Sequence, residues 1–409
     1  MLKQIPVSQL RIGMFLHDID LNLSLFPAVK TQTNISSKNL LHSIQDTGID
    51  QVTIDTTKGH DVTEPGLQSL KHQIEITRVK KNNRVPIPSA PLPDLEQTSY
   101  EDELKTALPL KKQVIESINN AFYDLKMGRS LDTSEIKKSV KHLTDSIIRN
   151  QDALLIINQI RHKNTYLYDH AINTCVLAVC FGKWKKLDYD TIISLGTAAL
   201  LHDIGETKLD DRLIRNKGHL NEHEFIEIQK HVEHSVKLLS TTIGVTPLTI
   251  TLVQQHHERL DGSGYPDGLS GNDINPISQI LGLVDVYDSM TAETTYSYAT
   301  APTHVLKQLL ESNDEMFDDL LIKQFIKCIG IYPVGSLVRL SNGCIAIVNE
   351  ITNQDSLHPK VKMIYNARQE HFIQPVDLNL ANPVDSGHKL SITGCVDPNH
   401  LHIDLAAFI

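Results

Sequence analysis

The sequence has no long apolar run, no paired-cysteine motif and no excess of positive charge. No stretch of about 18 apolar residues occurs, so we expect no membrane-spanning helix. The opening MLKQIPVSQLRIGMF has no charged leader before a long apolar stretch, so we expect no secretory signal. The five cysteines are scattered and form no CxxC, which favours reduced thiols and a cytoplasmic protein over a disulfide framework.

The charge of the chain is acidic, with a formal net charge of −10 and a sequence pI near 6.0. Such a chain repels polyanions at long range, so we expect no nucleic-acid polymer and no anionic membrane surface as a partner. A small anionic substrate would need local positive charge, and a bound metal ion can supply it.

The length of 409 residues exceeds what one compact core usually holds, so two or three domains are expected. Residues 1–80 mix short apolar runs with turn residues. Here LNLSLF and QVTIDT predict strands, and SSKNLLHSIQDTG predicts a short helix. We therefore expect a small α+β domain at the N-terminus. Residues 81–100 contain four prolines and no helical period, which predicts an extended linker.

The middle of the chain, residues 101–330, repeats apolar residues at spacings of three and four, which predicts a bundle of eight to ten helices. From residue 331 to 409 the pattern changes. SLVRLSNGCIAIVNEI predicts two strands joined at Asn342-Gly343, and PKVKMIYNA predicts a third. The predicted fold class is mainly α, with a helical-bundle core, a small α+β N-terminal domain and a small β-rich C-terminal extension.

Histidine is unusually frequent, with 20 in the chain and eight between residues 170 and 257. A lone histidine on a helix is more often a core or surface residue than a ligand. The pairs His17-Asp18 and His60-Asp61 have no histidine neighbours, so we interpret them as structural. His202-Asp203 differs, because it closes the apolar helix LGTAALLHDIG, where a charged pair is costly unless something neutralises it.

Further polar residues interrupt apolar patterns in the same region. His170 shares a helical face with Leu177 and Phe181, which directs its imidazole to the bundle interior. Asp285 lies within the apolar run ISQILGLVDVYDSM. Five imidazoles and two carboxylates then suit two divalent metals. The predicted ligands are His170, His202, Asp203, His231, His256, His257 and Asp285.

Nitrogen and oxygen ligands without thiolate favour iron or manganese first and zinc second. Two metals roughly 3.5–4 Å apart can share a hydroxide and bind a phosphate during in-line displacement. The residues by themselves thus predict metal-assisted hydrolysis of a phosphoester.

Three motifs, LLHDIG, HHERLDGSGYPDGL and LVDVYDSMTA, resemble in order and spacing the HD-GYP branch of the HD phosphohydrolase superfamily. FIKCIGIYPVGSLVRLSNGCIAIV is similar to the segment that follows this core in many members. IPVSQLRIGMFLHDIDLN is similar to an N-terminal domain often attached to it. The resemblance implies an all-helical core and hydrolysis of cyclic di-GMP, a bacterial second messenger, to pGpG or GMP.

The resemblance also implies roles for particular residues. His170, His202, Asp203 and Asp285 would hold one metal, and Asp203, His231, His256 and His257 the other. Asp203 would bridge the two metals and, with His202, carry the catalysis. His234 remains an alternative to His231. Tyr265 matches a position that contacts the nucleotide. It lies in the loop Asp261–Gly268, here called the GYP loop, for which a purely structural role stays open.

Three positions depart from the family pattern. Glu206 replaces the usual lysine of HDIGK, so an anion stands where a cation would meet the substrate. Lys208 is a candidate substitute for that cation, or Glu206 adds a carboxylate to the metal shell. MTAETTYSYATAP lacks the arginine and lysine of the usual DRPYRKA. Some members carry a glutamate that binds a third metal, and Tyr166 stands at that position here. The absence of this glutamate predicts two metals and not three.

The sequence leaves three functions open. The first is an active cyclic di-GMP phosphodiesterase. The second is a weak or inactive member that senses the nucleotide or docks signalling proteins through the GYP loop or the N-terminal domain. The third is a hydrolase of another phosphoester, such as a different cyclic dinucleotide. The metal, the product and the oligomeric state, which includes a homodimer as one option, also stay open.

Overall fold

The computed structural model describes residues 2–6, 10–19, 33–35, 51–59, 91–160, 166–214, 221–292, 300–311, 316–351, 357–383, 389–396, 403 and 405–408. The chain divides into two units. The first consists of Met1–Pro88 and Asp261–Ser263, and the second consists of Ser89–Leu260 and Gly264–Ile409.

The N-terminal unit contains an antiparallel sheet with strand order β1-β4-β2-β3. Its strands are β1 (Leu2–Pro6), β2 (Phe15–Ile19), β3 (Thr33–Asn34) and β4 (Gln51–Asp55). Ile5, Leu16 and Ile54 are buried and form part of its core. Strand β4 confirms the prediction from QVTIDT. The predicted strand LNLSLF and the predicted helix SSKNLLHSIQDTG lie outside the described residues, as do residues 81–90 of the predicted linker.

The second unit begins with the helices predicted for the middle of the chain. The α-helices are α3 (Tyr100–Lys126), α4 (Thr133–Ile157), α5 (Tyr166–Trp184), α6 (Tyr189–Leu201), α7 (Asp211–Ile214), α8 (Glu222–Ser240), α9 (Pro247–Gln255), α10 (Pro276–Thr291), α11 (Pro302–Glu311) and α12 (Asp319–Ile329). Two short 3-10 helices, η2 (Ile204–Lys208) and η3 (Gly271–Asp273), lie between them.

Side-chain caps fix where several of these helices begin. Asp188 accepts a hydrogen bond from the backbone of Thr191 at the start of α6. Asn221 and Glu224 form a reciprocal capping box at the start of α8. Such caps satisfy backbone N–H groups that have no partner within the helix. They therefore set the starting points of two helices that lead to predicted metal ligands.

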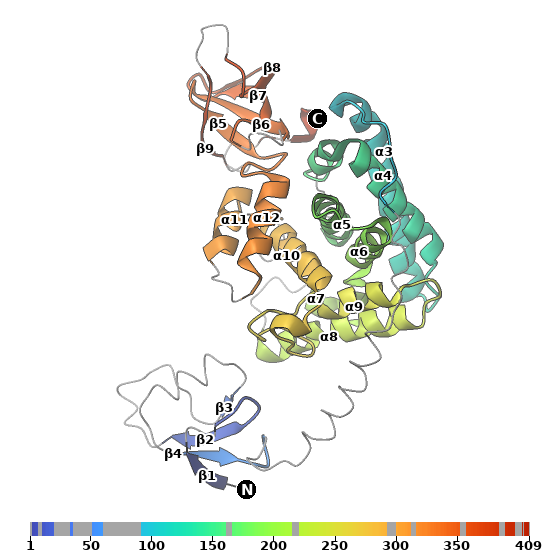
Figure 1. Ribbon diagram of the computed structural model, residues 1–409, viewed down its shortest axis with the longest axis vertical. Coiled ribbons are helices and arrows are strands. Elements are labelled where there is room, and N and C mark those ends of the chain that lie inside the picture. Colours follow the sequence, from blue (N-terminus) through green and yellow to red (C-terminus); the bar gives the residue numbers. More distant parts are fainter. Residues whose placement is uncertain are drawn as a thin grey trace. The chain divides into compact units, whose positions relative to one another are not determined.

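Helix α5 is the centre of the helical region (Figure 1). It packs against α4, α6 and α10, among others. Ile172, Val176 and Val179 are all fully buried. A helix that is apolar around most of its circumference has to be covered on most sides. The composition of α5 thus explains why the other helices surround it.

The C-terminal strands form a five-stranded antiparallel sheet with order β8-β7-β6-β5-β9. The strands are β5 (Leu337–Leu340), β6 (Cys344–Glu350), β7 (Lys360–Asn366), β8 (His371–Asn379) and β9 (Ile392–Cys395). The predicted hairpin at Asn342-Gly343 joins β5 to β6, and Gly343 has a φ of 89°. PKVKMIYNA forms β7. The region ends in the short helix η4 (Leu405–Ala407).

The predicted fold class, mainly α with small β parts, is confirmed. The C-terminal sheet nevertheless does not pack as a separate body. Ile345 and Ile347 of β6 belong to the same hydrophobic core as the helices, and the sheet lies in the same unit as the bundle. Alternate residues of β6 therefore extend the helical core.

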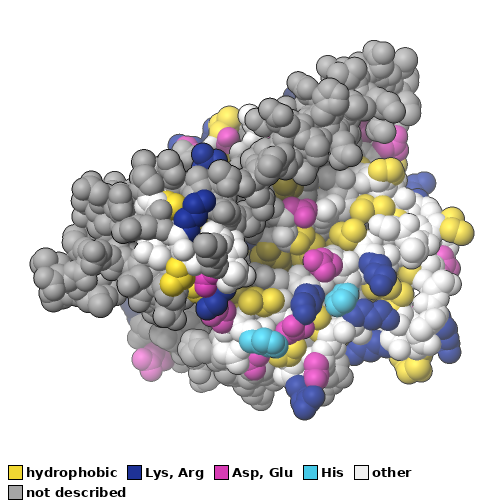
Figure 2. Space-filling view, turned by 90° about the horizontal axis from the view of Figure 1, so that it is seen from below, with side chains coloured by type: hydrophobic (Ala, Val, Ile, Leu, Met, Phe, Trp, Pro, Cys, Tyr) yellow, Lys and Arg dark blue, Asp and Glu magenta, His cyan; other side chains and the backbone are white. Residues whose placement is uncertain are grey.

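Charged side chains of both signs cover the described surface shown in Figure 2. Lysine and arginine are interspersed there with aspartate, glutamate and histidine. None of the helices in the described parts of the chain is long and apolar enough to cross a membrane.

A buried ion pair joins α3 to α4. Glu103 is 1% exposed and accepts two hydrogen bonds of 2.8 Å from the Arg149 guanidinium. Ser146 and Thr98 donate two more, of 2.6 and 2.9 Å. Burial works against the charged carboxylate, but these four bonds outweigh it and hold the pKa of Glu103 below its ordinary value.

Replacing Glu103 by glutamine should destabilise this unit, because the substitution leaves the Arg149 guanidinium without its counter-charge. Since water reaches part of Arg149, we expect a loss of roughly 2 kcal/mol in the free energy of unfolding. Urea unfolding followed by circular dichroism measures it. The matched control is Glu311→Ala, which removes an exposed pair with Lys307. Equal, small losses in both variants would contradict the prediction.

Candidate metal centre

The seven residues predicted as metal ligands come together at one place in the second unit. Helix α5 carries His170 and helix α10 carries Asp285. Helix α8 carries His231. The remaining four lie at helix ends: His202 and Asp203 follow α6, and His256 and His257 follow α9. They form two donor groups, His170, His202 and Asp285 in one, and Asp203, His231, His256 and His257 in the other. Their role as ligands remains a prediction.

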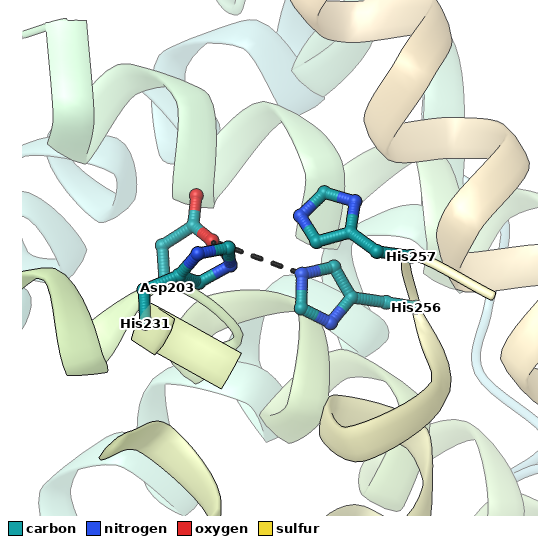
Figure 3. Close-up of side chains that lie close together, drawn as sticks. All are labelled: Asp203, His231, His256 and His257. Carbon is teal, nitrogen blue, oxygen red and sulfur yellow. Dashed lines mark ion pairs between the residues drawn. The ribbon is translucent and has the colours of Figure 1, made fainter. Parts of the chain in front are cut away.

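Asp203 faces both donor groups with different oxygens. Its Oδ2 lies 3.0 Å from Nε2 of His202 and 3.8 Å from Nε2 of His170. Its Oδ1 lies 3.3 Å from Nε2 of His231 and 3.8 Å from Nε2 of His256. Figure 3 shows the second group converging on Asp203. One carboxylate can therefore serve two cation positions at once.

Asp285 also divides its oxygens. Its Oδ1 lies 3.1 Å from Nε2 of His170 and 3.7 Å from Nε2 of His202. Its Oδ2 lies 3.8 Å from Nδ1 of His257. Asp285 is thus a donor of the first group and a neighbour of the second.

Three of the histidines are oriented by their own helices. His202, His231 and His256 each place Nδ1 against the backbone carbonyl three residues earlier. These carbonyls belong to Ala199, Ile228 and Val253, at 2.8, 2.8 and 2.6 Å. Because a carbonyl can only accept, Nδ1 carries the proton in each neutral ring. The lone pair then sits on Nε2, which points into the cluster.

These Nε2 atoms test whether the residues fit a metal. Within the described part of the chain, Nε2 of His202, His231 and His256 is buried and has no partner in hydrogen-bond geometry. Buried polar atoms are rarely left this way. Neutral imidazole nitrogens and carboxylate oxygens are ligands of zinc, iron and manganese. The donor set therefore fits divalent metal ions.

His170 is oriented differently, by a residue that sequence reasoning missed. Its Nδ1 lies 2.8 Å from Oδ2 of Asp288, one helical turn beyond Asp285. Both His170 and Asp288 are buried. The sequence could have indicated Asp288, because it lies in the same apolar run as Asp285 and burying a carboxylate is equally costly at both positions.

Glycines let the backbone segments approach at the ligand histidines. A Cβ on Gly205 would lie 2.0 Å from the carbonyl oxygen of His231, and one on Gly282 would lie 2.4 Å from that of His256. Gly205 donates its N–H to Ser235, whose hydroxyl donates to the carbonyl of His202. Helix α8 is thus held against the turn that carries Asp203.

The GYP loop covers one side of the cluster. The ring of Tyr265 lies 4.6 Å from the ring of His257, tilted by 32°. Phe225 of α8 lies 6.4 Å from Tyr265 and is 47% exposed. Glu258 anchors the loop by accepting hydrogen bonds from the backbone N–H groups of Asp267 and Leu269. Sequence reasoning did not single out Phe225 or Glu258.

Glu206, which replaces the family lysine, and Lys208, the candidate substitute for its charge, both lie in η2, directly after Asp203. Burial, together with the charge of Asp203, raises the pKa of Glu206 to about 7. The ammonium of Lys208 lies 3.4 Å from the carbonyl of Leu125 at the end of α3. This contact does not itself connect Lys208 to the cluster, and a substrate role for it remains a prediction.

The alternative ligand His234 does not join either donor group, whereas its neighbour His231 does. Several predicted features lie outside the described residues: the side chains of Tyr166, His17 and Asp18, the pair His60-Asp61, and the segment 293–299 that replaces the basic DRPYRKA pattern.

The charges of the cluster shift one another's pKa values. Burial opposes the imidazolium of His170, but hydrogen bonds to Asp285 and Asp288 outweigh it and raise its pKa to about 9. Burial would raise the pKa of Asp203, yet the neighbouring His202 and His231 hold it well below its ordinary range. The carboxylates therefore stay charged at neutral pH.

The pKa values of His256 and His257 shift in the opposite direction. Burial and the neighbouring His202 lower the pKa of His256 to about 3. Burial and the neighbouring His256 hold the pKa of His257 well below its ordinary value. Both rings are thus neutral at physiological pH, the form that binds metal.

Two parts of the chain match known families. Residues 154–321 match the family described as HD domain, and residues 2–136 match a domain of unknown function. The chain is 30% identical over 388 residues to a cyclic di-GMP phosphodiesterase of Pseudomonas aeruginosa, covering 94% of this chain and 91% of that protein. It is 32% identical over 144 residues to a 3'3'-cGAMP-specific phosphodiesterase of Vibrio cholerae, covering 35% of this chain and 33% of that protein.

A solved structure, a HDG"Y"P protein from Bdellovibrio bacteriovorus, aligns with a TM-score of 0.46 and 14% identity. The alignment covers 80% of this chain and 98% of that one.

Chelation should reveal the charge balance of the cluster as a pH dependence of stability. The pKa of His170 rises from 6.5 to about 9 on folding, so its proton stabilises the fold fully below pH 6.5. This stability is lost as the pH rises through the folded pKa. In chelator, the free energy of unfolding should therefore fall by roughly 3 kcal/mol between pH 6.5 and 9. Urea unfolding across this range measures the change.

The control for this pH dependence is His170→Gln, in which the fall should be shallower. Chelated wild-type protein whose stability stays constant or rises between pH 6.5 and 9 would contradict the prediction.

Proposed function

Because the chain belongs to the HD-GYP family of phosphodiesterases, we propose that it hydrolyses cyclic di-GMP to pGpG or GMP using two divalent cations. One cation position lies among His170, His202 and Asp285, and the other among His231, His256 and His257. Iron or manganese is the expected metal, and zinc is the second choice.

The observation that carries this proposal is the division of the Asp203 carboxylate between the two donor groups. Oδ2 faces His170 and His202, while Oδ1 faces His231 and His256. A shared carboxylate of this kind is what a pair of adjacent cations requires. Two such cations supply positive charge to a phosphate and acidify the attacking water.

The charges of the protein suit an anionic substrate only when cations are bound. Asp203, Asp285 and Asp288, the buried carboxylate behind His170, bring three negative charges to the cluster, and the imidazoles that bind metal are neutral. Two divalent cations would bring four positive charges, which leaves an excess of one for the phosphates. The acidic chain itself, with a net charge of −10, gives no general attraction for phosphate.

Aromatic side chains next to the metals support a nucleotide as the ligand. Tyr265 packs over His257 and beside the exposed Phe225. Purine bases stack on aromatic rings and gain roughly 1–3 kcal/mol per base. The ring planes of Tyr265 and Phe225 are 82° apart, so a guanine base would stack on one ring and meet the other with its edge, with the phosphodiester directed to the cations.

A second candidate function is binding without efficient catalysis. It is favoured by Glu206, a carboxyl group close enough to Asp203 to have its pKa raised by that charge. An ionised Glu206 would repel the substrate phosphate. In this function the chain would sense cyclic di-GMP or dock a signalling protein.

Hydrolysis is tested by incubating anaerobically purified, iron- or manganese-loaded protein with cyclic di-GMP and detecting pGpG and GMP. The variant His202→Ala, Asp203→Ala should lose at least about a thousandfold in turnover, since it removes donors from both positions. The 3'3'-cGAMP dinucleotide is assayed in parallel, because one relative acts on it. Tight nucleotide binding without product would favour the sensor function and contradict hydrolysis.

Restoring the family lysine should strengthen substrate binding. In Glu206→Lys an anion becomes a cation beside the phosphate, so KM for cyclic di-GMP should fall about tenfold with metal content unchanged. Glu206→Gln, which removes only the charge, should have an intermediate KM. If Glu206 instead ligates metal, both variants would bind less manganese, and metal analysis would detect this.

A further inference from the structure

We infer that Asp288 is a positioning residue that makes one of the two cation positions tighter than the other. The tighter position is the one among His170, His202 and Asp285. The inference rests on the proposed two-cation function, and it concerns an inequality between the positions that the family resemblance does not assign.

The first step is the contact behind His170. Oδ2 of Asp288 accepts a hydrogen bond of 2.8 Å from Nδ1 of His170. Asp288 is 1% exposed and His170 is 3% exposed. The two residues come from different helices, α10 and α5, so the bond also joins the two helices that carry His170 and Asp285.

The second step is the contrast with the other oriented histidines. His202, His231 and His256 donate from Nδ1 to neutral backbone carbonyls. Among the histidines described in the cluster, only His170 has its Nδ1 within hydrogen-bond distance of a carboxylate, since Nδ1 of His257 lies 3.8 Å from Asp285. A charge-assisted bond holds the ring more firmly than a neutral one and makes Nε2 more basic. His170 should therefore be the strongest nitrogen ligand of the set.

The third step is the distribution of negative charge. The first position has Asp285 as a donor, shares Asp203, and has Asp288 directly behind His170. The second position has Asp203 as its carboxylate donor, and its other donors are the imidazoles of His231, His256 and His257. Its neighbouring carboxyl groups are Asp285, which lies 3.8 Å from His257 but is a donor of the first position, and Glu206, whose pKa is raised to about 7. Buried charges are weakly screened, so the additional carboxylates raise cation affinity at the first position.

The fourth step is exposure. The side chains of His170 and Asp285 are 4% and 7% exposed, whereas that of His257 is 19% exposed. His231 and His256 are as buried as the donors of the first position, so the second position meets solvent through His257, on the side covered by Tyr265. A cation there should exchange faster and bind less tightly.

The inference is tested on the full chain, stripped of metal with chelator and titrated with manganese. Equilibrium dialysis with metal analysis counts the bound ions, and electron paramagnetic resonance separates isolated from coupled manganese. The wild-type protein should bind two ions in two classes at least about tenfold apart. At one equivalent the signal should be that of isolated manganese.

In Asp288→Asn the tight class should weaken about 10- to 100-fold, while the weak class changes less than about threefold. The matched control is Asp152→Asn, which replaces a buried carboxylate of α4 that accepts a bond from Ile351. It should leave both classes unchanged. Circular dichroism checks folding, and Asp288→Ser replaces Asp288→Asn if helicity is lost.

The outcomes are distinguishable. Two equal classes in the wild-type protein, or equal weakening of both classes in Asp288→Asn, would overturn the inference. Binding of fewer than two ions by the wild-type protein would overturn it together with the two-cation function. Two unequal classes, with selective loss in the variant, support the inference even if the loaded protein turns over no cyclic di-GMP.

Discussion

The constraint on which the site depends is the position of the half-buried Asp203 carboxylate between four imidazole nitrogens. A carboxylate in this position is stable only if its surroundings balance its charge, and each of its two oxygens faces a different pair of histidines. Nε2 of His202, His231 and His256 in turn has no partner in hydrogen-bond geometry within the described residues. The neighbouring His202 and His231 offset the charge of Asp203, but the three histidine nitrogens are left without partners. The proposed pair of divalent cations would bind these nitrogens and both oxygens of Asp203.

The helices position the candidate ligands at their C-terminal ends as well as along their buried faces. His202 and His256 occupy the C-caps of α6 and α9, where their Nδ1 atoms reach carbonyls of their own last turn. Glycines at 205 and 282 let neighbouring backbones approach the ligand histidines closely. The ligands are thus fixed by backbone geometry, which is stiffer than a network of mobile side chains. The mostly apolar α5 holds the surrounding helices in place, and Glu103 and Arg149 fix α3 against α4.

The two sides of the centre differ in the side chains that line them, which are charged on one side and aromatic on the other. Behind it, Asp288 supplies buried negative charge to His170 through a bond between helices. In front, the GYP loop presents Tyr265 beside Phe225, and the rings there are apolar and partly exposed. Charge on the buried side favours retention of a cation, and aromatic surface on the open side favours a nucleobase. Glu206 lies close to Asp203, and its raised pKa reflects the cost of adding another carboxylate to an already acidic centre.

The sequence by itself determined the helical period, the strand pairing at Asn342-Gly343 and the chemical types of the seven candidate ligands, because these depend on local spacing and on the cost of burying polar groups. It also placed His170 on an inward helical face. Only the tertiary structure decided that His231 and not His234 reaches Asp203, and that β6 shares the core of the bundle. The role of Asp288 was also decided only by the tertiary structure. Its role follows from a contact between helices 118 residues apart in the chain, and periodicity gives the face of each helix but not which side chain of another helix meets it.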